Sequence, residues 1–373
     1  MINLLLLFTF CIVLAYVVEI RTYSYENFRI GVRNDIQSRL CYIIMICCFI
    51  LFSGLRTWYN DTSGYMGLFE VLVDDKISWQ EFFKSYGGFE TYQSLIKKYI
   101  STNPQALILI SAILTNLLYI PFILKYSKNF VESIYLYCIG DLMFSMAGIK
   151  QSIAIGIALY AIDAYLSKKY FRAILLLYLA MTFHPYIICL VSVPLLTKKV
   201  WSFKTIFVVF VCAFLFMNME IVFEAFSLIG RDYSEISFDH HTINPMRVLV
   251  QSIPIIISFI YKNKINKNDS IILKLGINMR IISFVFIFMG LFANPIYLGR
   301  MSSYFSLLSV VTIPQMLHIC WDDEKNGNLY KIFYYILFFI YFVLDITKLG
   351  TYGLGYDHFR HTDIGIIFNM IGK

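Results

Sequence analysis

The sequence predicts an all-α, polytopic integral membrane protein with roughly 11–12 membrane helices or half-helices and a large external loop. Composition is the first reason: of 373 residues, 59% are hydrophobic and only 15% are charged, which excludes an ordinary soluble domain. The second is that long apolar runs recur from one end of the chain to the other. The third is that no internal repeat, low-complexity tract or flexible linker separates these runs. We therefore expect one transmembrane domain over residues 1–373.

Apolar runs form the expected spans. Most approach the roughly 20 residues that cross a hydrocarbon layer. The first run has no basic residue before it and no small-residue cleavage site, so we interpret it as a retained span rather than a signal peptide. In chain order the runs cover residues 3–18, 40–55, 104–124, 131–147, 149–166, 171–197, 205–224, 248–261, 275–293, 301–320 and 331–346.

The basic residues predict the orientation of these spans. The formal net charge is +7, but the Lys and Arg residues are scattered among short loops, which favours membrane orientation over nucleic-acid binding. With the N-terminus outside, the basic residues of 21–39, 125–128 and 168–172 face the cytoplasm. The loop over 56–103 then lies outside, where it carries five Lys or Arg against six Asp or Glu.

The run over 171–197 has two possible topologies, because it is interrupted at His184-Pro185. Proline removes a helical hydrogen bond and disfavours helix at the residue before it. The run is therefore either one long kinked span or a re-entrant hairpin with His184 at its tip. With a hairpin, 18 Lys or Arg lie on the cytoplasmic side and 12 lie outside. A single span places 15 on each side; Arg280 is left out of both counts. The excess of basic residues on the cytoplasmic side favours the hairpin.

Three cations that are far apart in the sequence fall on the expected outer face: Arg56, Lys150 and Arg300. Charges at the edge of the hydrocarbon are costly, so several on one side indicate an anionic substrate. The planar fork of Arg suits phosphate oxygens, and Lys150 opens a predicted helix, where free N–H groups favour anions. His184 lies at a helix break on the same face. The competing interpretation is that each cation only anchors a helix end among lipid headgroups.

The external loop mixes aromatic and acidic side chains, as carbohydrate-binding sites do. Asp61, in the segment NDTSGY, is the strongest acidic candidate. Over Trp79–Tyr86 an amphipathic interfacial helix would give the same aromatic pattern, and both interpretations stay open. The pairs His240-His241 and His358 with His361 lack a tetrahedral ligand set, so no metal site is predicted.

Four segments together carry a family resemblance: GLRTWYNDTSGYMGLF, GGFETYQSLI, IKQSIAIGIALYAIDAYLSKKYFRAILLLYLAMTFHPYIICLVSVPLL and LGRMSSYFSLLSVVTIPQML. Their order and spacing resemble the EpsG family, the Wzy-type polymerases of bacterial exopolysaccharide, capsule or O-antigen. Two residues depart from the family's pattern. Lys150 stands where Arg is usual, which loses the bidentate fork, and Pro185 stands where a small or polar residue is usual. The matching positions are Gly54-Leu55-Arg56, Asp61, Tyr65, Lys150-Gln151, Ala154, Phe183-His184, Arg300 and Tyr304-Phe305.

The resemblance implies a GT-C-like membrane enzyme in the bacterial inner membrane, with its site facing the periplasm or exterior. A growing glycan would leave undecaprenyl pyrophosphate and be transferred to the non-reducing-end hydroxyl of the next lipid-linked repeat unit. Fixed cations would stabilise the leaving pyrophosphate, so no metal or cofactor is expected. The expected partners are undecaprenyl-pyrophosphate-linked oligosaccharides, membrane lipid and a chain-length regulator, with no nucleic acid.

The residue roles that follow from the resemblance fall in two groups. His184 is the expected base, because imidazole titrates near neutrality, and Asp61 is the alternative base or the group that orients it. The remaining positions are expected to bind the pyrophosphate or the glycan: Arg56, Lys150, Gln151, Arg300, Tyr65 and Tyr304.

Two other functions remain as alternatives. A GT-C glycosyltransferase that uses a polyprenyl-phosphate sugar would place acidic residues in the first large external loop, where Asp61 or Asp74-Asp75 could serve. Such an enzyme adds one monosaccharide rather than a whole repeat unit. A flippase or other transporter of lipid-linked glycans would favour internal repeats and charges in the middle of spans.

Overall fold

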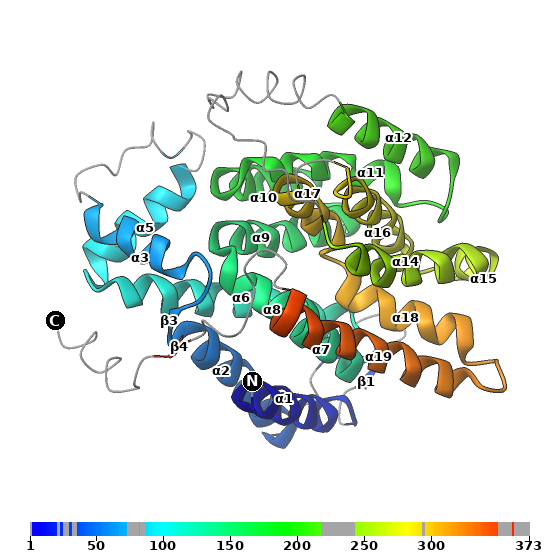
Figure 1. The fold of residues 1–373 in the computed structure, drawn as a ribbon, viewed down its shortest axis with the longest axis horizontal. Coiled ribbons are helices and arrows are strands. Elements are labelled where there is room, and N and C mark those ends of the chain that lie inside the picture. Colours follow the sequence, from blue (N-terminus) through cyan, green and yellow to red (C-terminus); the bar gives the residue numbers. More distant parts are fainter. Residues whose placement is uncertain are drawn as a thin grey trace. The chain divides into compact units, whose positions relative to one another are not determined.

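The computed structural model describes residues 2–20, 23–24, 30–31, 36–72, 82, 87–217, 243–292, 295–349 and 360–361 (Figure 1). The chain forms two compact units. Unit 1 comprises residues 1–160, 178–185 and 342–373, and unit 2 comprises residues 161–177 and 186–341. Each unit is described by itself below. The expectation of a single transmembrane domain stays a prediction.

The described helices confirm an all-α, multi-pass membrane protein. Seven helical segments in the described chain are long and apolar enough to cross a membrane. A bent pair, 297–306 with 309–321, raises the number to eight if it forms one span. Four shorter apolar helices cover 170–183, 185–196, 203–214 and 245–260. The seven segments are Ile2–Ile20, Ile36–Gly54, Pro104–Tyr126, Phe130–Ala147, Ile149–Leu166, Ile271–Met289 and Gly327–Lys348.

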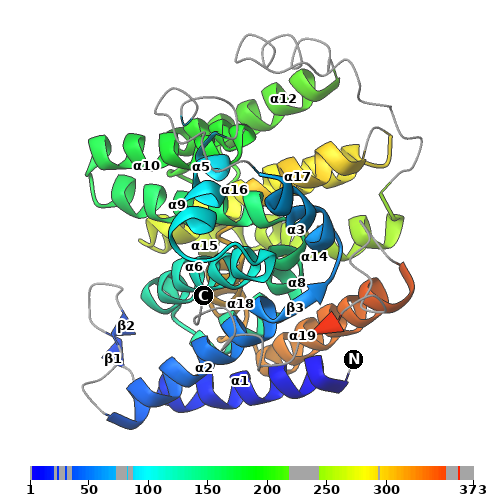
Figure 2. The ribbon, with the colours of Figure 1, turned by 90° about the vertical axis from the view of Figure 1, so that its left-hand side faces the viewer.

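Unit 1 begins with two apolar helices that pack side by side, α1 (Ile2–Ile20) and α2 (Ile36–Gly54), as Figures 1 and 2 both show. A short antiparallel pair, β1 (Tyr23–Ser24) and β2 (Ile30–Gly31), lies between them in the chain. Helix α2 also packs on α6 (Pro104–Tyr126). The two backbones approach closely at Gly54, where a Cβ atom would lie 2.7 Å from the side chain of Leu109.

The next predicted span, 131–147, is one helical run with a π-helical turn inside it. It comprises α7 (Phe130–Leu136), η1 (Tyr137–Asp141) and α8 (Leu142–Ala147). Tyr137 donates its hydroxyl to Asn116 Oδ1 at 3.1 Å, and Asn116 Nδ2 donates to Ser53 Oγ at 3.2 Å. These buried polar contacts tie the run to α6 and α2. Only Gly148 separates α8 from α9 (Ile149–Leu166).

The predicted external loop is folded against α6 in the part that the structure describes. It contains β3 (Arg56–Trp58), α3 (Thr62–Val71) and α5 (Gly87–Tyr99). Phe69 and Ile96 form a buried cluster with Ala106 and Leu107 of α6. Lys97 Nζ donates to the carbonyl oxygens at the end of α3, those of Phe69, Glu70 and Leu72, at 2.6–3.1 Å. The segment Trp79–Tyr86 lies outside the described residues apart from Phe82.

The run over 171–197 breaks where the sequence predicts. Helix α10 (Tyr170–Phe183) ends directly before His184, and a 3-10 helix, η2 (Pro185–Ser192), follows and leads into α11 (Val193–Leu196). His184 N–H still donates to Ala180 O at 3.0 Å, which completes the last turn of α10. Proline at the first position of the next element needs no helical hydrogen bond, which explains the boundary.

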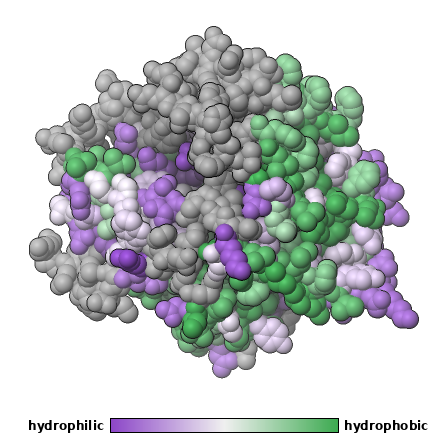
Figure 3. Space-filling model, viewed as in Figure 1, coloured by the Kyte–Doolittle hydropathy of each residue, from purple (hydrophilic) through white to green (hydrophobic). Residues whose placement is uncertain are grey.

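Unit 2 contains the end of α9, the first part of α10, most of η2, and α11. It also contains α12 (Phe203–Met217), α14 (Pro245–Ile260), α15 (Lys262–Lys267), α16 (Ile271–Met289), α17 (Pro295–Ser306), α18 (Ser309–Trp321) and most of α19 (Gly327–Leu344). The span predicted over 301–320 is two helices, α17 and α18, that meet at 60°. Figure 3 shows a broad hydrophobic surface where Figure 1 labels α12 and α14. The exposed hydrophobic residues of these two helices include Phe207, Phe210 and Leu249, as expected for lipid-facing helices.

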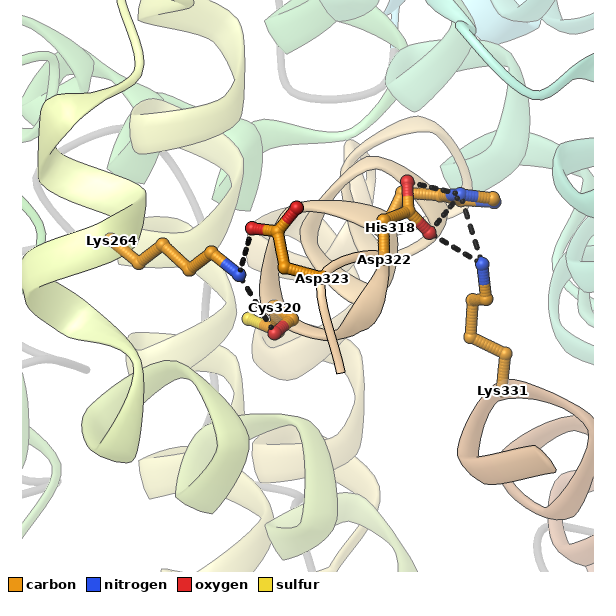
Figure 4. A network of polar contacts seen from close by, with 6 residues as sticks. All are labelled: Lys264, His318, Cys320, Asp322, Asp323 and Lys331. Carbon is orange, nitrogen blue, oxygen red and sulfur yellow. Dashed lines mark hydrogen bonds and ion pairs between the residues drawn. The ribbon is translucent and has the colours of Figure 1, made fainter. Parts of the chain in front are cut away.

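A polar network joins α15, α18 and α19 in unit 2 (Figure 4). Lys264 Nζ bonds Asp323 Oδ2 at 2.9 Å and Cys320 O at 3.2 Å. Lys331 Nζ bonds Asp322 Oδ1 at 2.6 Å, and His318 Nδ1 lies 3.0 Å from the same carboxylate oxygen. Lys264 lies on α15, just before α16, and Asp323 follows α18. Their ion pair therefore holds the start of α16 close to the end of α18.

Candidate functional site

The Arg56 side chain is buried at the base of the external loop, with 2% of its surface exposed. Its guanidinium donates to three groups of unit 1: Ser53 O, Met146 O at 2.9 Å and Thr62 Oγ1 at 3.2 Å. Burial lowers the pKa of Arg56 to about 9, so the group is still charged at neutral pH. A fixed positive charge therefore lies between α2, α3 and α8.

Hydrogen bonds also fix the backbone around Arg56. Gln105 Nε2 donates to Gly54 O at 2.7 Å and to Arg56 O at 3.0 Å. Thr62 Oγ1 donates in turn to Tyr59 O at 2.6 Å. Next to the guanidinium is a small cavity of about 10 Å³, the space of one water molecule. Its lining is mostly polar: Ser53, Arg56, Ser111, Ala112, Thr115, Asn116, Ser145, Met146 and Ile149.

Lys150 lies at the N-terminus of α9, where the sequence places it, and it is half-buried. Its Nζ atom lies 5.0 Å from the centroid of the Phe89 ring and 5.9 Å from that of Tyr65. Both distances are within the range of cation–π attraction. Tyr65 belongs to α3 and Phe89 to α5, so both helices of the external loop contact this ammonium group. The neighbouring Gln151 is buried.

The end of α10 reaches the same aromatic side chains. Phe183 lies 6.4 Å from Phe89 and 6.0 Å from Tyr92, measured between ring centroids. Tyr65 in turn lies 5.8 Å from Phe89. We call Tyr65, Phe89, Tyr92 and Phe183 the aromatic cluster. His184, the residue after Phe183, is 95% buried. The cluster therefore connects the segment that carries His184 to the rings that hold Lys150.

Close backbone packing fixes this arrangement. A Cβ atom on Gly88 of α5 would overlap the side chain of Thr182 and approach the Thr182 backbone to 3.0 Å. Only a residue without a side chain permits this approach. Tyr92 adds a bond to α6, because its hydroxyl lies 3.0 Å from Ser111 Oγ.

Asp61 has a different environment from the other candidates of unit 1. It directly precedes α3, its side chain is exposed, and its carbonyl accepts the Tyr65 N–H at 3.0 Å. Its carboxylate forms no capping bond to the helix. An exposed carboxylate on this loop remains accessible to a sugar hydroxyl.

Arg300 and Tyr304 belong to unit 2 and are described only there. Both lie on α17, four residues apart. Arg300 is exposed, whereas Tyr304 is fully buried. The six other predicted site residues, Arg56, Asp61, Tyr65, Lys150, Gln151 and His184, all belong to unit 1.

A comparison with family models identifies the chain's family. The model of the EpsG family matches residues 39–356, which is most of the chain. The chain belongs to the EpsG family. No curated protein and no solved structure matches it. All eight predicted site residues of this EpsG family chain lie within the matched region.

Three residues that contact the candidate site were not indicated by the sequence. Thr62 and Phe89 were not distinguished from other loop residues, since only their contacts with Arg56 and Lys150 reveal them. His361 is the third: β4 (Arg360–His361) pairs antiparallel with β3, with His361 opposite Arg56. His358, His240-His241 and Asp74-Asp75 lie outside the described residues. Among those described, no group of three or more His, Cys, Asp or Glu could hold a metal.

Proposed function

We propose that this EpsG family protein is a metal-independent glycosyltransferase that polymerises oligosaccharide repeat units. The donor is a growing glycan on undecaprenyl pyrophosphate, and the acceptor is the non-reducing-end hydroxyl of the next lipid-linked repeat unit. The bond from the sugar's anomeric carbon to the pyrophosphate oxygen breaks, and the acceptor oxygen bonds that carbon. The bonding electron pair leaves with the pyrophosphate, and the hydroxyl proton goes to a protein base.

One observation carries this proposal: the aromatic cluster brings the Lys150 ammonium and the His184 segment together beside the external loop. A pyrophosphate leaving group needs fixed positive charge, and an attacking hydroxyl needs a base. Aromatic faces also suit the apolar faces of sugar rings. The same small region of unit 1 supplies positive charge, a candidate base and aromatic faces.

The residues have different proposed roles. Lys150 contacts the pyrophosphate, and the buried charge of Arg56 adds to the positive potential while it fixes the loop. Arg300 is the proposed third cation. His184 accepts the acceptor's proton, and the exposed Asp61 orients the acceptor hydroxyl. Gln151, Tyr65 and Tyr304 are proposed to contact the glycan or the pyrophosphate.

The strand pair β3–β4 supports the proposed topology. Residues 56 and 361 must lie on one side of the membrane to pair, so an even number of crossings separates them. If the bent pair 297–321 is counted as one span, nine apolar segments of the described chain lie between them. Eight of these cross if 170–196 is re-entrant. With this count for the described segments, the pairing supports a hairpin with His184 at its tip. With the N-terminus outside, β3 and β4 face the periplasm or exterior of a bacterial inner membrane.

The substrates follow from this chemistry. The proposed partners are undecaprenyl-pyrophosphate-linked oligosaccharides, held by the cations through the pyrophosphate, and the surrounding membrane lipid. A separate chain-length regulator is also proposed. These assignments rest on family membership and on the charge of the site.

Glycan profiling of a deletion strain tests the proposal. Loss of the chain should leave single repeat units on the lipid carrier or at the cell surface. Loss of all surface glycan, with lipid-linked units accumulating inside the cell, would instead identify a flippase. Units that lack one monosaccharide would identify a transferase of single sugars.

Complementation with His184→Ala tests the mechanism. Loss of a general base lowers the rate by about 10²–10⁴-fold, so long-chain glycan should disappear while the protein level stays normal. His318→Ala is the control, because His318 lies in the polar network of unit 2. Long-chain glycan made by the His184→Ala strain would exclude this residue as the base.

A further inference from the structure

The C-terminal strand β4 contacts the Arg56 segment although it lies beyond the region that matches the EpsG family, which ends at residue 356. His361 pairs with Arg56 and Arg360 pairs with Trp58, and the register shifts between these two pairs. Thr57 Oγ1 adds a contact of 3.4 Å to Arg360 O. Residues more than 300 positions apart thus form one small sheet at the candidate site.

The His361 side chain makes two further contacts with the end of α2. Its Nε2 atom lies 2.8 Å from Phe52 O. Its ring meets the Phe52 ring edge-on, with centroids 5.0 Å apart. A carbonyl oxygen only accepts, so Nε2 carries the proton and donates. Burial, together with the nearby Arg56 charge, lowers the pKa of His361, so the ring is neutral at pH 7.

We propose that His361 is a positioning residue for the Arg56 segment. The other contacts of this segment come from α2, α3, α6 and α8, through Ser53, Thr62, Gln105 and Met146. His361 adds a backbone pairing with Arg56 of β3 and a contact with Phe52 O in the last turn of α2. It thereby fixes both segments. This role deepens the proposed polymerase function and rests on it, because the Arg56 charge must stay in place for the pyrophosphate.

A disulfide tests the strand pair without reference to activity. Opposed residues of a regular antiparallel pair have Cα atoms about 4.5–5.5 Å apart, within disulfide range. Residues 58 and 360 are opposed, next to the register shift. The pair Trp58→Cys with Arg360→Cys should therefore cross-link on mild oxidation of membranes, and peptide mass spectrometry should find the 58–360 linkage. Val71→Cys with Arg360→Cys is the control, because Val71 is exposed at the far end of α3. Absence of the 58–360 linkage would overturn the proposal.

Two variants separate the contacts of His361. His361→Gln keeps an N–H donor for Phe52 O, and His361→Phe keeps a ring but has no donor. We expect His361→Phe to lower the polymerisation rate about five- to tenfold, as for loss of one hydrogen bond, and His361→Gln to retain most of it. Hydrogen–deuterium exchange of residues 52–62 should rise in His361→Phe and stay near wild type in His361→Gln.

The outcomes distinguish the two proposals. If His361→Phe matches wild type in exchange and rate, or if His361→Gln behaves no better than His361→Phe, the positioning role is wrong. If the wild-type chain makes no polymer, the proposed function fails, while cross-linking and exchange still decide whether His361 holds the Arg56 segment.

Discussion

The Nζ atom of Lys150 lies 5.0 Å from the centroid of the Phe89 ring, so the first turn of α9 is joined to the external loop by a cation–π contact. Phe89 also packs against Phe183, the residue before His184. One buried ring therefore contacts both the proposed phosphate-binding cation and the segment of the proposed base. This relationship gives the site its most direct tests.

Removal of the Lys150 charge should abolish most activity. Lys150→Met keeps the length and apolar stem of the side chain but cannot stabilise a leaving pyrophosphate, so we expect a loss of about 100-fold or more. Lys150→Arg should retain part of the rate, because the charge remains. The measurement is the length distribution of the polymer at equal protein level. Lys98→Met is the control, since Lys98 stacks on Tyr99 of the same loop and is exposed.

Wild-type polymer from the Lys150→Met strain would remove Lys150 from the site. Equal loss in Lys98→Met would show that the assay reports the general integrity of the loop rather than the charge at position 150.

Separation of α5 from α10 should impair the site without any change of charge. Gly88→Ala places a methyl group against Thr182, including its backbone, so one helix must shift. Phe89 and Phe183 would then move apart, and we expect lower polymerisation at a normal protein level. Gly64→Ala is the matched control, because nothing lies within 4 Å of the added methyl group on α3. Full activity of Gly88→Ala would contradict the packing described for α5.

The hydroxyl of Thr62 should be needed to hold Arg56. Thr62→Val removes the acceptor of Arg56 Nε and the donor to Tyr59 O. An unsatisfied buried donor costs about 1–3 kcal/mol, so thermal unfolding in detergent should occur at lower temperature. Thr62→Ser keeps the hydroxyl and should behave like wild type. Equal unfolding temperatures for the Val and Ser variants would show that the bond to Arg56 contributes nothing.

The polar network of unit 2 should make stability depend on pH. Burial alone would raise the pKa of Asp322, but hydrogen bonds from Lys331 and His318 outweigh it and lower that pKa. A carboxyl with a lowered folded-state pKa stabilises above its unfolded-state pKa, and this stabilisation is lost as the pH falls through the folded-state value. Asp322→Asn should therefore destabilise at pH 7 but not at strongly acidic pH.

The size of this effect is small, below about 1 kcal/mol, because the Asp322 side chain is 52% exposed and solvent screens the pair. Chemical unfolding of the two proteins at several pH values measures it. A difference between wild type and Asp322→Asn that grows toward acidic pH would contradict the direction of the pKa shift.

Local features of the sequence were predicted well. The apolar lengths predicted the long helices, and His184-Pro185 predicted the break after α10, because both depend on neighbouring residues only. The bend between α17 and α18 was not predicted. The two residues between these helices, Leu307 and Leu308, are apolar, and no Pro or Gly marks the boundary.

The candidate site was predicted in part. Motif order indicated Arg56, Lys150, Arg300 and His184 as one group. Arg56, Lys150 and His184 belong to unit 1 and Arg300 to unit 2, so their common site stays a prediction. The burial and the contacts of these side chains were not predictable from the sequence. Arg56 was expected to face the substrate, whereas its guanidinium is buried and donates to Met146 O and Thr62 Oγ1. The contact of Arg56 with pyrophosphate that the sequence indicated stays a prediction.

The sequence by itself determined that this chain crosses a membrane many times and carries the motifs of the EpsG family, because hydrophobic length and residue order are properties of the linear chain. Only the tertiary structure decided that Phe89 supports Lys150 and that His361 pairs with Arg56. Such contacts join segments separated by tens to hundreds of residues, and they exist only after the helices between those segments have packed.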